Sequence, residues 1–517
     1  MKLKAFALAL GLAVATLPAD AATFRFAFQG DLKSLDPYSL NETFTHGVLG
    51  NVYEGLTKRD KELKIVPGLA ESWETPEPTR WRFHLRKGVK FHNGEDFTAD
   101  DVVFSATRLH APASDVKTRF PADTKVVKVD DHTVDFILSG PNPILHAEWD
   151  TWYILSKKWA EANGSAQPQP QAGQQMSYAA LHANGTGPFI ITEHQAGVKT
   201  VFKPNPKWWG KPEHNFDEVI FTTISNDATR VAALLSGDVD WADPIPLQDV
   251  ERVNASANAK VMQGPELRTI FLGFDQYRDE LKYSNVKGKN PFKDVRVRKA
   301  FYLAIDENAI ADKVMRKAAV PSALMISPLL FPLAKDFTRP KTDPAEAKKL
   351  LTEAGYAKGF DAGELVCDAV YAGTGEAVVN NLLHVGIRAK LRPLERAAFY
   401  KGDAEKSFKK LVRPGSAAAG NAATRIEAFV ITGGIRSYGG YPDIDGLFRE
   451  QAVELDPKKR EAMLHKIQQL MYERAMFAPI VEPAFLSGVG PRVDPATLSL
   501  IPGHAFSYPY EEIRLKR

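Results

Sequence analysis

The sequence contains very little cysteine: Cys367 is the only one in 517 residues. A single thiol forms no internal disulfide, and paired CxxC motifs are excluded with it. The chain also lacks HExxH, a Walker phosphate loop and the GxSxG nucleophile elbow, which build common hydrolytic and phosphate-binding centres. Because Cys367 ends the apolar run Leu365-Val366-Cys367, we expect a buried, inert thiol. We therefore predict no catalytic residue, no cofactor and no enzymatic activity.

Charge of either sign is not in excess. Lysine and arginine number 66, aspartate and glutamate number 63, and the formal net charge is +3. A nucleic-acid partner requires a concentrated basic face, so this balance argues against one. His84, His92 and His110 are near one another in the sequence. We expect His84 to face outward from a strand and His92 to begin a turn, so the three side chains would not converge on one ion. We therefore assign no metal site, and leave open whether a metal chelate is bound.

Beyond the amino terminus, no hydrophobic run is long enough to cross a bilayer. Lys2 and Lys4 precede an apolar stretch over residues 5–17, and Ala19-Asp20-Ala21 has the small-x-small pattern of a signal-peptidase site. The apolar stretch is shorter than the ~20 residues of a membrane-spanning helix. We predict that residues 1–21 are a signal peptide cleaved after Ala21, with an uncut signal anchor as the alternative. No cysteine follows to carry a lipid, so we expect a protein free in a periplasm.

The run over residues 67–109 predicts a strand, a turn and a capped helix in succession. Trp81, Phe83 and Leu85 alternate with polar residues, which is typical of a strand with one buried face, and the pattern predicts that the strand continues through 89–91. His92-Asn93-Gly94 then favours a tight turn. Thr98 is placed to cap the helix that follows. Elsewhere, we predict strands at 23–28, 134–138 and 216–224, and helices at 228–235, after Asp343-Pro344 and after Asp456-Pro457.

Strands and helices alternate through both halves of the chain, which favours an α/β architecture. Two stretches without periodicity, 166–175 and 416–423, predict exposed loops. A chain of this length exceeds what one hydrophobic core usually serves, so we expect at least two lobes.

Five segments, which follow one another along the chain, resemble those of the peptide/nickel class of bacterial extracellular solute-binding proteins, called family 5. They are the run over 67–109, Leu35-Asp36-Pro37, GTGPF at 185–189, NPKWWG at 205–210 and DVRVRKA at 294–300. The resemblance implies a two-lobed periplasmic binding protein fold of type II, in the large class with an extra subdomain, with mixed sheets and a two-stranded hinge. It implies lobe I over 22–272 and 484–517, an extra subdomain over about 57–183, lobe II over 273–483, and crossings at 273–277 and 483–490.

The same resemblance implies a function. Such proteins capture a solute between their lobes and deliver it to an inner-membrane ABC permease, and we expect a monomer. A secreted hydrolase with dispersed carboxylates and a periplasmic sensor subunit are the alternatives from other classes. The run over 67–109 is expected to lie in the extra subdomain, away from direct contact with the solute.

In the peptide-binding relatives, one loop after the first strand and one loop in the second lobe hold the ligand. Here the second loop is 433–443, and Tyr438 falls where relatives carry the aspartate that pairs with a peptide ammonium. A tyrosine carries no charge at neutral pH, whereas the guanidinium of Arg436 suits a carboxylate or phosphate. The predicted ligand residues are Asn41, Thr43, Gly434, Arg436, Tyr438, Gly439 and Tyr441.

This departure predicts a non-peptide solute: an opine, a sugar conjugate or another anionic or hydroxylated compound. A dipeptide or oligopeptide is the alternative. Two further interpretations stay open at this point. Arg436 could pair with Asp443 or Asp445 inside the loop, and a shift of the alignment by a few residues would place Asp443 in the cleft as an acidic anchor.

Overall fold

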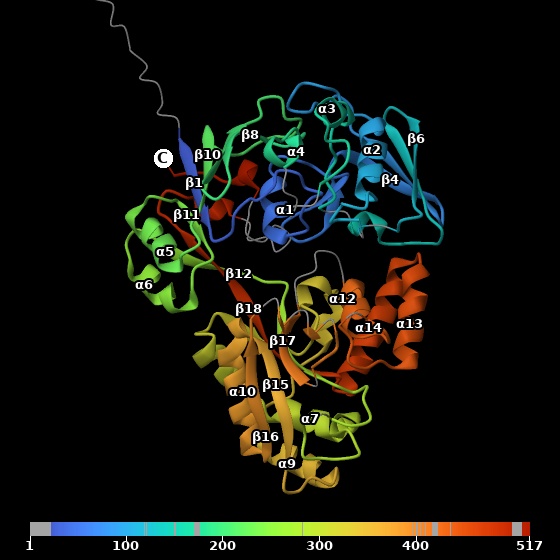
Figure 1. Ribbon diagram of the computed structural model, residues 1–517, viewed down its shortest axis with the longest axis vertical. Coiled ribbons are helices and arrows are strands. Elements are labelled where there is room, and N and C mark those ends of the chain that lie inside the picture. Colours follow the sequence, from blue (N-terminus) through green and yellow to red (C-terminus); the bar gives the residue numbers. More distant parts are fainter. Residues whose placement is uncertain are drawn as a thin grey trace, which may run out of the picture.

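The computed structural model describes residues 22–516, except 118, 120, 149–150, 170–175, 282, 396–397, 400–401, 404, 409, 416–421, 435 and 499–508. The predicted signal peptide, residues 1–21, lies outside the described residues. The described chain forms an upper lobe I and a lower lobe II that are joined at one side (Figure 1). Within these residues, no helix has both the length and the apolar character needed to span a membrane.

Lobe I is built on a mixed sheet with the strand order β11-β1-β10-β9-β8. The strand predicted at 23–28 is confirmed. It runs parallel to both β10 and β11, and its apolar side chains are buried, as is typical of a parallel strand covered on both faces. The elements of this part are β1 (Thr23–Phe28), α1 (Thr43–Leu49), α3 (Lys157–Ala162), α4 (Tyr178–Leu181), β8 (Phe189–Gln195), β9 (Lys199–Pro204), β10 (Glu218–Thr223), α5 (Asp227–Ser236), β11 (Trp241–Asp243), α6 (Val250–Ala255) and β12 (Lys260–Pro265).

The segment between α1 and α3 folds against lobe I as a separate antiparallel sheet. Its four strands have the order β4-β5-β7-β6, and a two-stranded pair, β2 and β3, lies beside them. The elements are β2 (Thr57–Arg59), β3 (Ile65–Pro67), β4 (Ala70–Glu77), β5 (Arg80–Leu85), α2 (Ala99–Leu109), β6 (Lys125–Asp130) and β7 (Thr133–Ile137). The predicted strand, turn and capped helix are all present here: β5 alternates in burial, Gly94 has φ +92°, and Thr98 and Asp101 form a capping box.

One part of that prediction is wrong. β5 ends at Leu85, and residues 89–91 do not continue it. Instead, the backbone N–H of Phe91 donates to Glu95, and that of Phe97 donates to Val89, so the segment pairs across its own turn. Val89 and Phe91 are nevertheless buried, because this short turn folds back onto the core of lobe I.

Lobe II carries parallel and antiparallel pairs in the order β16-β15-β17-β13-β18. Apolar side chains are buried on both faces of this sheet and form two cores. One lies under α7, α9 and α10, and the other lies under α12 and α14. The elements are β13 (Thr269–Phe274), α7 (Val295–Ala304), α8 (Glu307–Ala309), β14 (Ala319–Pro321), α9 (Pro344–Glu353), β15 (Phe360–Asp368), α10 (Ala372–His384), β16 (Ile387–Leu394), β17 (Lys410–Gly415), α12 (Ala422–Phe429), α13 (Pro442–Val453), α14 (Pro457–Glu473) and β18 (Phe477–Val489).

Two extended segments connect the lobes. The first part of β18 pairs with β13, and its last part, Ala484 to Val489, pairs with β12. Because β12 runs into β13 within a few residues, the chain crosses at about 265–269 and again at about 481–484. The crossing predicted at 273–277 was placed too late, since Gly273 and Phe274 pair with β17 inside lobe II. The stretch predicted at 483–490 lies mostly within β18.

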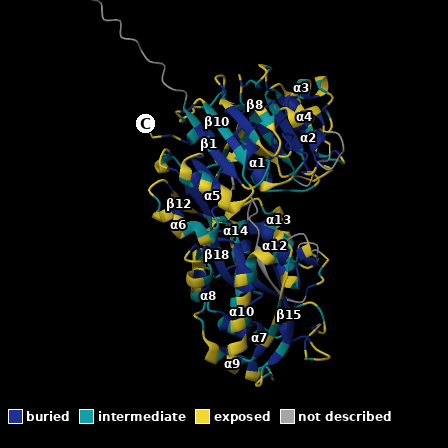
Figure 2. Cartoon of the chain, turned by 60° about the vertical axis from the view of Figure 1, so that its left-hand side comes forward, coloured by how far each residue is buried: buried dark blue, intermediate teal, exposed yellow. Residues whose placement is uncertain are grey.

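The two predicted loops fall largely outside the described residues. Residues 170–175 and 416–421 belong to that part of the chain. Ala422 and Ala423 are described, and there the loop prediction is wrong, because both residues are buried in the first turn of α12. Their small side chains pack into the core beneath α12. Buried residues fill the strands inside both lobes, and exposed residues gather on the outer helices and loops (Figure 2).

Candidate functional site

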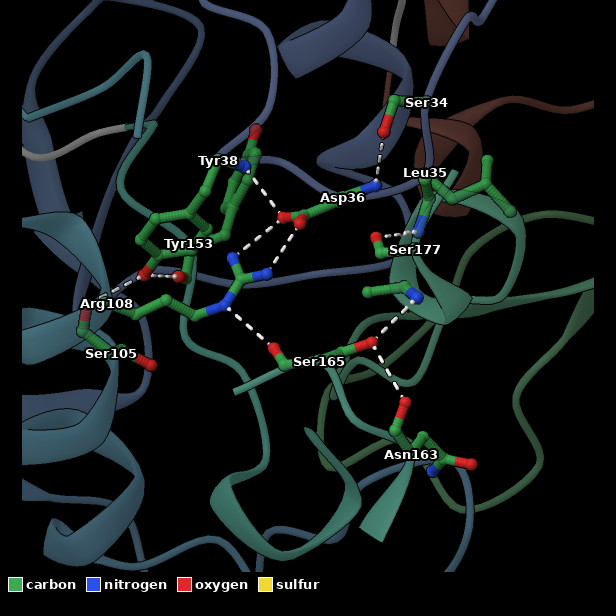
Figure 3. Close-up of polar contacts among 12 residues, drawn as sticks. Ser34, Leu35, Asp36, Tyr38, Ser105, Arg108, Tyr153, Asn163, Ser165 and Ser177 are labelled. Carbon is green, nitrogen blue, oxygen red and sulfur yellow. Dashed lines mark hydrogen bonds and ion pairs between the residues drawn. The ribbon is translucent and has the colours of Figure 1, made fainter. Parts of the chain in front are cut away.

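The loop after β1 is held in place by a buried ion pair. Arg108, near the end of α2, donates from Nη1 to Asp36 Oδ1 at 2.8 Å and from Nη2 to Oδ2 at 2.5 Å (Figure 3). Both side chains are 0% exposed. The third nitrogen of the guanidinium is also bonded: Arg108 Nε donates to the carbonyl of Ser165 at 3.3 Å. A paired and hydrogen-bonded charge tolerates such burial, so the contact fixes the start of the loop to α2.

Tyr38 extends this arrangement into the core. Its backbone N–H donates to Asp36 Oδ1 at 3.0 Å, and its hydroxyl donates to the carbonyl of Tyr153 at 2.9 Å. The indole N–H of Trp152 donates to the same hydroxyl at 2.9 Å, and the Arg108 guanidinium lies over the tyrosine ring. Burial raises the pKa of Tyr38, so the hydroxyl stays neutral. These contacts make the loop a rigid support for the residues that follow it.

The two predicted ligand residues of lobe I lie on this support. Asn41 and Thr43 are exposed, and Thr43 is the first residue of α1. The backbone N–H of Asn41 donates to Asp115 Oδ2 at 2.7 Å, and its side-chain oxygen accepts from Arg119 Nη2 at 3.1 Å. Both side chains therefore reach the surface of lobe I from a fixed backbone.

Arg436 is a partly exposed predicted ligand residue in the loop of lobe II before Pro442. Its side chain is 29% exposed, and Nη1 lies 3.4 Å from Asp403 Oδ2. The backbone N–H donates to the carbonyl of Ala428 at 2.8 Å, which ties the loop to the end of α12. The guanidinium also lies 5.8 Å from the ring centre of Phe429. It is thus held at the loop while part of it remains open to solvent.

Tyr438 occupies a different environment from the one predicted. It is 7% exposed and packs with Val366, Phe399 and Phe408, and its hydroxyl donates to the Asp403 carbonyl at 3.3 Å. A side chain so buried supports the loop and presents little surface to a solute. The ring makes up most of the surface of the side chain and packs in an apolar cluster, while the hydroxyl donates to the Asp403 carbonyl.

The two glycines of the loop allow close backbone contacts. A Cβ atom on Gly434 would lie 2.5 Å from the backbone oxygen of Glu427, and one on Gly439 would lie 2.8 Å from Cβ of Gln276. Both distances are too short for any side chain. Gly434 and Gly439 therefore let the loop pack against α12 and against the segment that follows β13.

Tyr441 is engaged within lobe II. Its hydroxyl donates to Gln276 Oε1 at 3.1 Å and accepts from Arg298 Nη2 at 3.2 Å, while the Arg474 guanidinium lies 4.6 Å from its ring centre. Arg474 also pairs with Asp443, at 2.6 Å between Nη2 and Oδ2. These contacts fix the start of α13 to α7 and α14.

The contacts of Asp443 and Asp445 bear on the two open interpretations of the loop. Asp443 pairs with Arg474, and Asp445 Oδ1 accepts from the backbone N–H of Thr432 at 2.9 Å. Arg436 pairs with Asp403, and no ion pair joins it to Asp443 or Asp445 among the described residues, so the suggested pairing was wrong. Asp443 is likewise engaged by a cation, which argues against its use as an open acidic anchor.

The cysteine and histidine predictions can be checked in the same way. Cys367 is buried, as predicted, and burial raises the pKa of its thiol to about 11. His84 faces outward, with a 46% exposed side chain, whereas burial lowers the pKa of His92 to about 4. Within the described part of the chain, no group of three or more His, Cys, Asp or Glu residues is placed to hold a metal ion.

Lobe I contains a cavity of about 820 Å³ that the sequence did not suggest. The Glu54 carboxylate accepts from the Thr186 hydroxyl at 2.8 Å and from the indole N–H groups of Trp208 and Trp209 at 3.2 and 2.8 Å. Glu511 lines the same cavity, and burial raises its pKa to about 7. All the described lining residues belong to lobe I, so we do not assign this cavity to a solute held between the lobes.

Sequence reasoning also missed charged residues where the lobes approach each other. Burial raises the pKa of Glu148 in lobe I; Glu427 of α12 adds to this rise, whereas Arg460 of α14 and Arg119 oppose it. Glu148 and the two lobe II residues are about 280 residues or more apart in the chain. No local pattern could have indicated that these charges act on Glu148.

The family model that matches the chain is described as bacterial extracellular solute-binding proteins, family 5 middle. It matches residues 64–436, more than half of the chain. Among curated proteins, the dipeptide-binding protein of Escherichia coli K12 is 31% identical over 320 residues, which cover 57% of this chain and 56% of the relative. The match thus spans little more than half the length of that relative.

Solved structures resemble the whole fold. HbpA2 from Haemophilus parasuis has a TM-score of 0.81 at 22% identity, covering 96% of this chain and 100% of that chain. The PBP AgaA from A. tumefaciens R10, in complex with agropinic acid, has a TM-score of 0.70 at 22% identity, over 96% of this chain and 98% of that chain. These likenesses confirm the predicted two-lobed α/β fold.

Proposed function

The chain belongs to family 5 of the bacterial extracellular solute-binding proteins, and from this premise we propose that it captures a small solute between its lobes and delivers it to an inner-membrane ABC permease. The family match carries the proposal. Two features of the molecule support it: each lobe has its own hydrophobic core, and extended segments around β12, β13 and β18 join the lobes. We further propose that the protein acts in a periplasm as a soluble monomer after loss of residues 1–21.

Closure about these segments would supply the mechanism. A solute shifts the ratio of open to closed forms only if it binds one form more tightly, so it must contact both lobes. With the crossings at about 265–269 and 481–484, lobe I comprises residues 22–265 and 484–516, and lobe II comprises 269–481. We keep 57–183 as the extra subdomain of lobe I.

Asn41 and Thr43 are our candidates for solute contacts from lobe I, and Arg436 is our candidate from lobe II. The exposure of the first two, and the partial exposure of the third, support these roles. The burial of Tyr438 and the contacts of Gly434, Gly439 and Tyr441 favour supporting roles for the rest of the predicted set.

For the solute, we propose a non-peptide compound with an anionic or hydroxylated group, such as an opine or a sugar conjugate. The engagement of Asp443 by Arg474 supports this, because a peptide ammonium needs a free carboxylate partner when it is desolvated. AgaA, which has the same fold, was solved with agropinic acid. The named curated relative binds dipeptides, so a peptide is the alternative.

Native mass spectrometry of the protein purified from its own cells tests both levels of the proposal. We expect one small non-peptide compound to remain bound. A mixture of peptide masses would overturn the solute class and leave solute binding intact. A protein that carries no compound and releases none on denaturation, and that binds neither peptides nor opines in calorimetry, would overturn solute capture itself.

Calorimetry with the compound identified in this way tests Arg436. The Arg436→Ala variant should bind at least about tenfold more weakly, roughly 1.4 kcal/mol. Arg449→Ala is the matched control, because Arg449 is exposed on α13 in the same lobe. Equal affinity of the Arg436→Ala variant and the wild type would remove Arg436 from the site.

A further inference from the structure

A small cavity lies inside lobe II, where its two hydrophobic cores meet. Tyr302 of α7 belongs to the core on one face of the sheet, and Met471 of α14 belongs to the core on the other face. Both side chains line the cavity, together with Phe477 and Pro479 of β18 and the segment over 323–325. The cavity therefore lies at the junction of α7, α14 and β18.

Two side chains bring polar groups to this cavity. Gln468 of α14 is 0% exposed, Tyr302 is 5% exposed, and both line the cavity. In the described part of the chain, neither amide atom of Gln468 has a hydrogen-bond partner, and nor does the hydroxyl of Tyr302. Buried polar atoms in proteins nearly always have a partner, in the chain or in an ordered water, because burying an unpaired polar group is unfavourable. Gln468 and Tyr302 thus indicate a small polar ligand.

The remaining side chains around the cavity leave hydrogen bonding to Gln468 and Tyr302. The hydroxyl of Tyr472 is already engaged, because it donates to the carbonyl of Thr338 at 2.7 Å. The other described residues of the lining are apolar, namely Ala323, Leu324, Met325, Met471, Phe477 and Pro479. An occupant held by side-chain hydrogen bonds must therefore reach the Gln468 amide or the Tyr302 hydroxyl.

The size and charge of the cavity identify the class of occupant. The centre of a water molecule has about 20 Å³ of room there. One water needs about 10–15 Å³ by this measure, so the cavity admits one water and no larger solute. No charged side chain lines it among the described residues, and the Arg339 guanidinium lies 4.3 Å from the ring centre of Tyr302, which disfavours a cation. Burial raises the pKa of Tyr302, so its hydroxyl is neutral and able to donate.

We propose that this cavity binds one water molecule, which bridges the Gln468 amide and the Tyr302 hydroxyl and so joins α14 to α7. An amide offers donors and an acceptor, and a hydroxyl offers both, so one water can satisfy the two side chains together. Arg298, one turn before Tyr302 in α7, donates to the carbonyl of Arg474 after α14 at 2.7 Å. The water adds a second link between the same two helices, and this role does not depend on the proposed function.

A high-resolution crystal structure of the protein tests the site directly. We expect one peak of electron density at about 2.7–3.2 Å from both the Gln468 amide and the Tyr302 hydroxyl. Combining Gln468→Met with Tyr302→Phe replaces both polar groups by apolar groups of similar shape, so the peak should disappear in that double variant. Tyr472→Phe is the matched control, because its hydroxyl lines the same cavity but bonds to Thr338, and the peak should remain.

Urea denaturation of the same variants measures whether the two side chains act through a shared water. Gln468→Met and Tyr302→Phe should each raise the equilibrium constant for unfolding about fivefold or more, because each leaves the other group without its partner. The double variant should fall short of the product of the two single effects by at least about twofold. Gln469→Met is the control for additivity with Tyr302→Phe, since the Gln469 amide donates to Glu473 on the exposed side of α14.

Three results would overturn the proposal. The first is a direct hydrogen bond between Gln468 and Tyr302 with no peak between them. The second is a peak that persists in the double variant, and the third is additivity of the two single variants. Each can occur while mass spectrometry still finds a bound solute, so the water site and the proposed function can fail separately.

Discussion

Removing one partner of the Asp36–Arg108 pair should destabilise lobe I strongly. In Asp36→Asn, the guanidinium keeps its place, but its Nη2 atom then faces an amide in place of a carboxylate oxygen. Both side chains are completely buried, so no water replaces the lost acceptor. Breaking a buried ion pair by removing one member costs about 3 to 5 kcal/mol. That is a large part of the ~5–15 kcal/mol that separates folded from unfolded states.

The double variant separates the charge from the packing. Asp36→Leu with Arg108→Met replaces both ions by apolar side chains, and such replacements are often neutral or stabilising. We therefore expect the double variant to be more stable than Asp36→Asn or Arg108→Met alone. Lys293→Met is the matched control, because its partner Asp279 is almost fully exposed and such pairs contribute about 0 to 1 kcal/mol.

Urea denaturation followed by tryptophan fluorescence measures the effect. Trp152 reports directly, since its indole donates to the hydroxyl of Tyr38 beside the ion pair. Hydrogen exchange over residues 36–43 should also be faster in Asp36→Asn, because the loop loses its anchor to α2. A free energy of unfolding within about 1 kcal/mol of the wild type for both single variants would refute the reasoning.

Two further predictions concern lobe I and lobe II separately. The pKa of Glu511 is raised from 4.5 to about 7 on folding, mainly by burial, so the folded state holds the proton more tightly. The contribution of this group to the free energy of unfolding should therefore be fully present below pH 4.5 and fall by at most about 3 kcal/mol as the pH rises to 7. In Glu511→Gln, the free energy of unfolding from denaturation curves should change less over this pH range. In lobe II, the Asp343 side chain accepts from the backbone N–H of Glu346 at 2.9 Å and caps α9. Asp343→Ala should cost about 1 kcal/mol in the same assay, whereas an unchanged midpoint would show that the cap contributes nothing.

The elements predicted best depend on neighbours in the sequence. The alternation around Phe83, the capping box at Thr98 and the cap at Asp343 each involve residues within a few positions of one another, so the pattern is visible in the chain itself. The hinge prediction was late because the lobe to which β13 belongs is decided by its pairing with β17 and β18. Those partners lie about 140 and 200 residues further along, and nothing near Gly273 reveals them.

The loop over 433–443 illustrates the limit for the site. The sequence shows that the loop carries a cation, Arg436, which suggests an anionic solute. It does not show that Arg436 pairs with Asp403, which precedes it by 33 residues and belongs to no shared motif. Tyr438 was expected in the cleft because of its place in the family pattern. The apolar cluster that buries it comes from β15 and from the 399–408 segment, so its burial follows from packing and not from spacing.

The run over 67–109 identified the family but was expected to lie away from the solute. The structure adds a physical connection, because Arg108 at its end is the residue that fixes Asp36, and through it the loop that carries Asn41 and Thr43. The backbone N–H of Asn41 donates to Asp115, which follows α2. Since a binding residue must be held by its surroundings to keep its geometry, Asn41 and Thr43, if they contact the solute as proposed, depend on this segment to position the lobe I loop.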